Sequence, residues 1–276
     1  MSAALRRARP ALGTLVEFRV EGLDEAAAVR AIAAAYAEVQ TVHRLMSFHQ
    51  ADSDLARLHR TPVGAILRVD ARTHEVLDWA LRIAAASRGC FDPTIAVAQV
   101  AAGRLPRPDS AWAADPSATW RDIELLDGER VRLHRRLWID LGGIAKGYAV
   151  DRAIEVLQAH GAAQACVNAG GDLRVFGPCA ERVHVRAGGG CVAVLEVADG
   201  AVASSAAATA LHGSARTPVA SGTTASVVAA RCIVADALTK VILCAGEGAC
   251  CQILDAFDAS AAIGRGGDWR LLSAAA

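Results

Sequence analysis

The chain has 276 residues, of which 53% are hydrophobic but only 4% aromatic, and its formal net charge at pH 7 is zero. This length can bury a sizeable core, built mainly from alanine, valine and leucine, and we expect a single domain over residues 1–276. A neutral chain gives no reason to expect binding to nucleic acid or to an anionic membrane surface.

No targeting segment is predicted. A signal peptide needs an apolar run of roughly 7 to 15 residues, but Gly13, Thr14, Glu17 and Arg19 interrupt the segment after the charged N-terminus. No stretch approaches the ~20 apolar residues of a membrane span. We therefore expect a cytoplasmic protein without a signal peptide or lipoprotein segment. The eight cysteines lack C-x-x-C spacing, which argues against zinc and predicts reduced core residues.

The first half of the chain mixes helical and strand periodicities. In order, the pattern predicts a strand (15–20), a long helix (24–46), a short helix (53–59), an extended segment (63–69) and a second long helix (73–87). Asp24 and Ser53 are suited to cap the first two helices, and Gly89 to end the third. The core-facing residues expected on the long helix are Val29, Ile32, Tyr36, Val39 and Val42.

The second half is richer in short strands. Residues 101–118 are expected to be irregular, and a hairpin is predicted around Asp127-Gly128. Further predicted strands are 137–141, a segment ending at Asn168, 183–187, 191–197, 202–205, 225–234, 261–264 and 268–272, with helices at 235–245 and 248–257. Runs of strands with few crossover helices predict an α+β fold with mostly antiparallel sheets and packed helices.

Two glycine turns, each beside a carboxylate, flank one predicted helix in the middle of the chain. The first contains Asp140, the pair Gly142-Gly143 and, three residues on, Lys146. Such a turn lets backbone approach a charged ligand closely, so Asp140 is suited to ring or ribose donors of a nucleotide and Lys146 to its phosphates. The P-loop and dinucleotide-binding patterns are absent. A tight turn with an exposed lysine explains the same residues.

Phe91 and Asp92 follow the glycine that ends a helix. They offer an aromatic platform and a carboxylate to a flat heterocycle, or simply form an Asx-Pro turn. Asp236, Thr239 and Lys240 share one face of a predicted helix. The carboxylate and hydroxyl oxygens can hold a hard cation, but Asp236 is equally suited to cap that helix.

Asp172 follows the second glycine turn and His212 lies in a polar loop. Each is a candidate site residue, but Asp172 is equally explained as a turn residue and His212 as a solvated side chain.

Six motifs in the chain resemble those of one family. They are L-G-T (12–14), M-S-F-H-Q-A-D-S-D-L (46–55), G-C-F-D-P-T (89–94), D-L-G-G-I-A-K-G-Y-A-V-D (140–151), V-N-A-G-G-D-L-R-V-F-G (167–177) and A-D-A-L (235–238). In this order they resemble the motifs of the ApbE-type FAD:protein FMN transferases. The resemblance implies an ApbE-like α+β fold and cleavage of the FAD diphosphate with the help of magnesium. It also implies attachment of FMN to a threonine or serine of a target flavoprotein, with release of AMP.

The resemblance carries roles onto matching positions. The residues that would contact FAD are Leu12, His49, Cys90, Phe91, Asp92, Asp140, Lys146 and His212. Those that would hold the metal are Gly143 through its carbonyl, Asp236 and Thr239, together with position 240. His212 is the nearest match to the base that takes the acceptor's proton, and Asp236 would steady the diphosphate in catalysis.

The chain also departs from the family pattern. His49 and His59 replace a usual tyrosine and asparagine, and the loop after His212 is shortened and lacks its aspartate. Lys240 stands in place of a metal-binding threonine. An ammonium there would pair with Asp236 and supply one positive charge instead of two. A unit charge at ~4 Å is worth roughly 4 kcal/mol at an effective dielectric of ~20, or about 10³-fold in rate.

The sequence therefore leaves three functions open. The first is FMN transfer, the second a catalytically impaired or non-catalytic FAD-binding protein, and the third slow hydrolysis of FAD to FMN and AMP.

Overall fold

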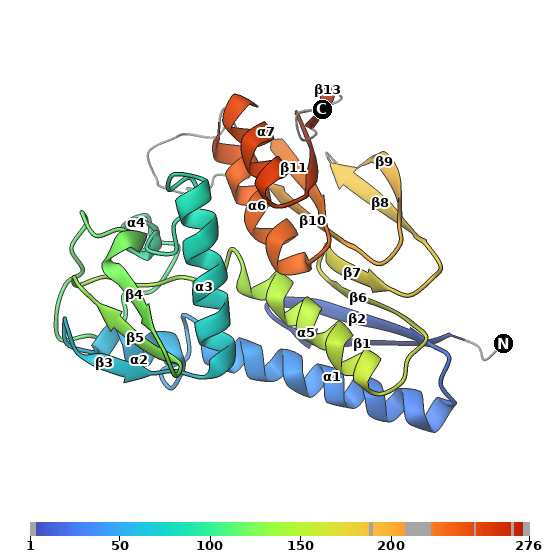
Figure 1. The fold of residues 1–276 in the computed structure, drawn as a ribbon, viewed down its shortest axis with the longest axis horizontal. Coiled ribbons are helices and arrows are strands. Elements are labelled where there is room, and N and C mark those ends of the chain that lie inside the picture. Colours follow the sequence, from blue (N-terminus) through green and yellow to red (C-terminus); the bar gives the residue numbers. More distant parts are fainter. Residues whose placement is uncertain (1–3, 188–189, 208–221, 246, 266–267, 273–276) are drawn as a thin grey trace.

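The computed structural model describes residues 4–187, 190–207, 222–245, 247–265 and 268–272. Its largest element is an eight-stranded antiparallel sheet in the order β1-β2-β6-β7-β10-β11-β12-β13 (Figure 1). These strands are β1 Leu5–Ala11, β2 Thr14–Glu21, β6 Gln164–Ala169, β7 Asp172–Phe176, β10 Ala201–Ala206, β11 Thr223–Ala229, β12 Ser260–Arg265 and β13 Asp268–Leu272. β1 and β13 are its outer strands in this order.

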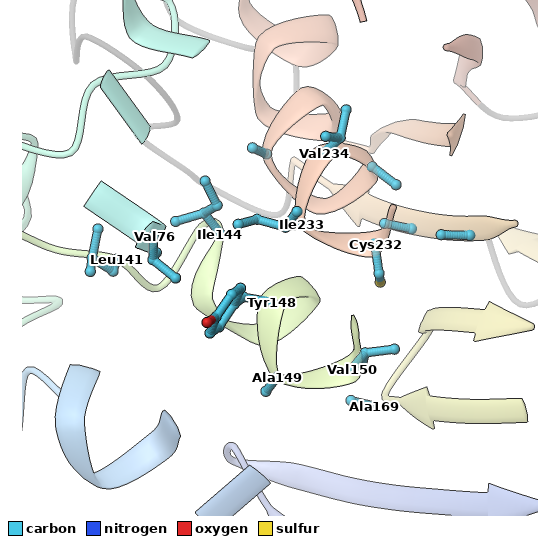
Figure 2. Close-up of a cluster of buried hydrophobic side chains, with 14 of the residues drawn as sticks. Val76, Leu141, Ile144, Tyr148, Ala149, Val150, Ala169, Cys232, Ile233 and Val234 are labelled. Carbon is cyan, nitrogen blue, oxygen red and sulfur yellow. The ribbon is translucent and has the colours of Figure 1, made fainter. Parts of the chain in front are cut away.

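Three helices cover one face of this sheet: α1 Glu25–Met46, α5 Ala145–Ala159 and α6 Cys232–Cys244. Alternate residues of β2, namely Val16, Phe18 and Val20, are buried against them, because side chains of a strand point to opposite faces in turn. α5 contacts both α1 and α6. Figure 2 shows side chains from the beginnings of α5 and α6 meeting in one buried cluster.

Two smaller sheets complete the architecture. The first has the order β3-β5-β4 and lies with α2 and α3 at one end of the molecule, and the second is a hairpin of β8 and β9 (Figure 1). Their strands are β3 Ile66–Arg68, β4 Ile123–Leu126, β5 Arg130–Leu133, β8 Glu181–Ala187 and β9 Gly190–Val197. The remaining helices are α2 Asp54–Arg60, α3 Ala71–Ala86, α4 Ala96–Ala101, α7 Glu247–Ala256 and the 3-10 turn Trp120–Asp122.

The predicted α+β class with mostly antiparallel sheets is confirmed. Asp24 and Ser53 cap α1 and α2 by accepting backbone N–H groups, and Gly89 adopts the positive φ expected just beyond α3. The cysteines whose side chains are described form no disulfide. Within the described ranges, no helix combines the length and apolarity that crossing a bilayer requires.

The strand predicted at 137–141 is wrong. The segment is buried but has no strand partner, because its backbone groups are satisfied in other ways. The N–H of Ile139 donates to the ring of His59 at 2.9 Å, and the N–H of Asp140 donates to the carbonyl of Pro93 at 2.8 Å. A side chain and a loop thus replace the neighbouring strand that the apolar run suggested.

The boundary predicted between a strand at 225–234 and a helix beginning at Ala235 is also wrong. β11 ends at Ala229, and α6 begins at Cys232. Its first N–H groups, those of Cys232 and Ile233, donate to the carboxylate of Asp151 on α5, each at 2.9 Å. The cap comes from a distant helix, so the local sequence gives no sign of it.

Other differences are smaller. The charged segment that forms β1 was not predicted, nor was α4, and the extended segment at 63–69 reduces to β3. Val29 was expected in the core but is 42% exposed. The neighbouring alanines Ala28, Ala31 and Ala35 are buried instead, because the short side chain of alanine lets α1 lie close to its neighbours.

Candidate active site

A cavity of about 690 Å³ opens beside the start of α5. The turn between β1 and β2, the end of α1, the segment after α3 and the start of α5 all contribute to it. Residues predicted as binding residues that line it are Leu12, His49, Phe91, Asp92, Asp140, Gly143 and Lys146. A volume of this order suits a small-molecule ligand, and the lining mixes apolar, acidic and basic groups.

The start of α5 forms one wall of the cavity. Asp140 accepts a hydrogen bond from the N–H of Gly142 at 2.9 Å. Burial raises the pKa of Asp140, although the Gly142 N–H and nearby His49 oppose this. The N-cap residue of α5, Ile144, provides no side-chain hydrogen bond. The N–H of Ala145 donates to the carbonyl of Leu141 at 2.8 Å, and that of Gly147 to Oδ2 of Asp236 at 3.0 Å. The positive end of the helix dipole favours an anion at this wall.

His59 positions this wall, a role that the sequence analysis missed. Its Nε2 accepts the N–H of Ile139 at 2.9 Å and lies 3.1 Å from the carbonyl of the same residue. Burial lowers the pKa of His59 to about 4, so the ring is neutral at pH 7 and able to accept. The available signal was its position on the apolar face of α2, four residues after the buried Leu55.

Phe91 and Asp92 form a neighbouring part of the lining. Asp92 accepts from the N–H of Thr94 at 2.8 Å and from its hydroxyl at 2.7 Å, which is the turn that the sequence suggested. Burial raises the pKa of Asp92. Phe91 is only 5% exposed, so its ring is a buried wall beside Gly143 rather than an open platform.

Two lysines on the cavity wall each contact a buried aspartate. The Nζ atom of Lys146 lies 2.7 Å from Oδ2 of Asp172. Lys240 donates to the backbone carbonyl of Asp236 at 2.9 Å and to its Oδ1. Both lysines line the cavity, whereas neither aspartate does. The two carboxylates, 1% and 0% exposed, therefore act as a negative layer behind a positive surface.

Burial and neighbouring charges shift the pKa values of Lys146 and Asp172. Burial alone would lower the pKa of Lys146, but Asp172 and Asp236 outweigh it and raise that pKa. Burial, and then the charge of Asp236, raise the pKa of Asp172 to about 6. Lys146 and Lys240 are also the only lysines in the whole sequence. An anionic group such as a diphosphate would meet both ammonium groups here.

The family model described as the ApbE family matches residues 12–263. The chain belongs to the ApbE family. Among curated relatives, it is 30% identical over 185 residues to an FAD:protein FMN transferase of Treponema pallidum, covering 62% of this chain and 51% of the relative. It is 31% identical over 176 residues to an FAD:protein FMN transferase of Rhodobacter capsulatus, covering 60% of this chain and 33% of the relative. The chain thus spans about half the length, or less, of these two relatives.

Solved structures support the ApbE fold. The flavinyl transferase ApbE of Pseudomonas stutzeri, in its apo form, superposes with a TM-score of 0.81 at 19% identity, covering 98% of this chain and 95% of the other. The ApbE protein of Thermotoga maritima gives a TM-score of 0.79 at 24% identity, covering 98% and 97%. At these identities the likeness concerns the fold alone.

The residues expected to hold magnesium in an ApbE protein do not fit a divalent cation here. Oδ1 of Asp236 is bound by Lys240, and Oδ2 accepts the N–H of Gly147 at 3.0 Å. The hydroxyl of Thr239 donates to the backbone carbonyl of Asp236 at 2.7 Å and lies 2.8 Å from the hydroxyl of Ser205. Among the described residues, no group of three or more acidic, histidine or cysteine side chains is arranged for a metal ion. An ammonium occupies the place where an oxygen-rich site would be needed.

Cys90 and His212 are the remaining expected site residues. Cys90 is half-buried but does not line the cavity, and burial raises the pKa of its thiol. Its expected contact with FAD thus has no support in the cavity lining. His212 lies outside the described residues.

Proposed function

We propose that the protein binds FAD and transfers the FMN half to a threonine or serine hydroxyl of a target flavoprotein, releasing AMP. The observation that carries the proposal is the convergence of separate ApbE motifs on one cavity, which Leu12, Phe91, Asp140 and Lys146 line. The names of the curated relatives support the same reaction. Family membership supports the choice of FAD as the nucleotide.

Different lining residues suit different parts of the ligand. Lys146, Lys240 and the start of α5 face the diphosphate, because they provide the positive charge of two ammonium groups and the positive end of a helix dipole. Asp140 accepts from donors of the ring or ribose. Leu12 and the wall around Phe91 contact the flat ring. Oriented positive charge is the main contribution that a protein makes to transfer of a phosphoryl group.

The proposed reaction exchanges the phosphoanhydride bond of the FAD diphosphate for a phosphoester bond to the acceptor. The acceptor hydroxyl oxygen attacks the phosphorus of the FMN half. The bond from that phosphorus to the bridging oxygen of the diphosphate breaks, and the bridging oxygen leaves as part of AMP. His212 is proposed to take the hydroxyl proton. Asp236 is proposed to assist by orienting Lys240, which it contacts through two oxygens.

Magnesium is not assigned a step. A metal held by Gly143, Asp236 and Thr239 would require Lys240 to leave Asp236. We assign the positive charge at this position to Lys240 instead, since its ammonium already neutralises a fully buried carboxylate.

The contact between Lys240 and Asp236 also favours a second candidate function. One positive charge in place of two stabilises a developing diphosphate charge less well. The protein would then bind FAD without transferring FMN, or hydrolyse FAD slowly to FMN and AMP with water as the acceptor.

One experiment separates these functions. Purified protein is incubated with FAD and a candidate acceptor flavoprotein, with magnesium in one sample and a chelator in the other. Intact mass of the acceptor and chromatography of the nucleotides are then measured. Transfer adds one FMN to the acceptor and releases AMP, hydrolysis yields free FMN and AMP, and a binding protein leaves FAD intact.

FAD binding is tested separately by flavin fluorescence. Lys146→Met should weaken FAD binding at least tenfold, since one of the two ammonium groups is lost. Failure of the wild-type protein to bind FAD at all would contradict both candidate functions.

A further inference from the structure

A second cavity, of about 760 Å³, lies on the face of the eight-stranded sheet opposite α1, α5 and α6. Along β2 and β6, its floor consists of residues that alternate with the buried ones: Glu17, Arg19, Cys166 and Asn168. β8 forms a wall from Glu181 to Val185. The result is an open groove between the sheet and the β8–β9 hairpin, which we call the outer groove.

Two strands that border the outer groove have an open edge. In the described ranges, β1 pairs only with β2, and β8 pairs only with β9. The backbone N–H and C=O groups along each free edge therefore have no strand partner. An extended peptide can add to such an edge through main-chain hydrogen bonds, while side-chain pockets provide specificity.

The charges of the outer groove select the kind of peptide. Its lining contains four arginines and two glutamates: Arg6, Arg7, Arg19, Arg182, Glu17 and Glu181. Arg19 is paired with Glu181 and Glu21, whereas Arg6 and Arg182 are exposed and make no ion pair within the described residues. The free positive charge favours carboxylates. It also disfavours pairing of β1 with a second copy of itself, because arginines would face arginines.

The outer groove also has an apolar part and a connection to the active site. Val183, Val185, Leu173 and Val202 contribute to its lining. Gly170, in the turn between β6 and β7, lines both this groove and the cavity beside α5. A segment lying in the groove therefore reaches the mouth of the cavity at this turn.

We propose that the outer groove docks an extended segment of the acceptor protein in which acidic and apolar residues alternate. The segment adds to the free edge of β8, with its apolar side chains on the face of Val183 and Val185 and its carboxylates on the opposite face, with Arg182, while Arg6 adds positive charge from β1. This inference rests on the proposed function, because only a protein acceptor needs such a surface. The groove would hold the acceptor while its hydroxyl enters the cavity past Gly170.

The test uses the full chain and two labelled peptides of about ten residues, one alternating glutamate with valine and one alternating lysine with valine. Fluorescence polarisation should show binding of the glutamate peptide only, weakening as salt screens the charges. The double variant Arg6→Glu, Arg182→Glu should weaken that binding at least tenfold. Arg30→Glu is the matched control, since Arg30 is exposed on α1, away from the groove, and should leave binding unchanged.

Two results would overturn the proposal: equal binding of both peptides, or an undiminished affinity in the double variant. Self-association of the wild-type chain that the double variant abolishes would also overturn it, by assigning the groove to a second copy. Flavin fluorescence of FAD is measured for every variant. The double variant should bind FAD like the wild type, so loss of peptide binding is distinguished from failure of the proposed FAD site.

Discussion

The ammonium group of Lys240 contacts two oxygens of Asp236, the backbone carbonyl at 2.9 Å and one carboxylate oxygen. The two residues lie one helical turn apart on α6, so the helix itself brings them together. Asp236 is completely buried and Lys240 reaches the cavity. The contact therefore neutralises an inner charge and exposes a cation to the ligand.

Replacing Lys240 tests this arrangement. Lys240→Thr removes the ammonium and leaves the carboxylate of Asp236 uncompensated, which costs about 3–5 kcal/mol when one partner of a buried ion pair is lost. The variant should melt at a lower temperature than the wild type. Magnesium should restore much of the loss in the variant, because the vacated oxygens can then bind it.

The wild type should show little change in melting temperature with magnesium, and calorimetry should show weak binding. Tight, stoichiometric binding of magnesium to the wild type would contradict the role assigned to Lys240.

At Gly147, α5 packs directly against α6. A Cβ atom added there would lie 2.3 Å from the carbonyl oxygen of Cys232 and 2.8 Å from Cβ of Asp236. Gly147→Ala should therefore destabilise the fold by about 1–3 kcal/mol through overpacking, measured by urea unfolding. Gly248→Ala is the matched control. It adds the same methyl group within α7, where nothing lies within 4 Å, and should stabilise by roughly 0.5–1 kcal/mol.

Asp151 connects the two helices a second time. It caps α6 and lies 3.0 Å from Arg174, and it is itself fully buried. Asp151→Ala should lower the free energy of unfolding by about 3–5 kcal/mol, since it removes the cap of α6 and leaves the charge of Arg174 without this partner. Asp78→Ala is its control, because that pair with Arg82 is solvent-exposed. There the change should stay within about 1 kcal/mol.

His59 predicts a dependence of stability on pH. Its pKa is lowered from 6.5 to about 4 in the folded protein, so between these values the unfolded chain binds more protons. Its contribution is therefore fully present above pH ~6.5 and is lost as pH falls towards ~4. His59→Asn keeps an acceptor for the N–H of Ile139 but does not titrate. The wild type should lose roughly 2.5 kcal/mol relative to this variant between pH ~7.5 and ~4.5.

The comparison with His59→Asn is needed because other groups titrate in the same range. Asp172, whose pKa is raised to about 6, contributes more stability to the folded protein as pH falls. It therefore opposes the loss of stability caused by His59. A constant difference between wild type and variant across this range would refute a neutral, buried His59.

The sequence predicted what is encoded locally. The caps at Asp24 and Ser53, the hairpin at Asp127-Gly128 and the closing strands all follow from nearby residues. The motif residues lining the cavity were found through resemblance, since a glycine turn alone does not name its ligand.

The two wrong assignments at 137–141 and 225–234 share a physical cause. Asp151 caps a helix more than eighty positions away, and His59 satisfies the backbone of a segment eighty positions away. Each contact decides whether a stretch is a strand, a coil or the start of a helix. Neither leaves a periodic signal in the sequence, so a local pattern assigns those boundaries to the wrong residues.

The restriction of lysine to two positions gives the site a chemical handle. The remaining basic residues are all arginine or histidine. Reagents that acylate amines therefore have only three targets in the chain, namely Lys146, Lys240 and the α-amino group. Acylation mapped by mass spectrometry would therefore act as a footprint of the candidate active site. Occupancy by a nucleotide would register as protection of both lysines against an unchanged N-terminus, without any need to observe turnover.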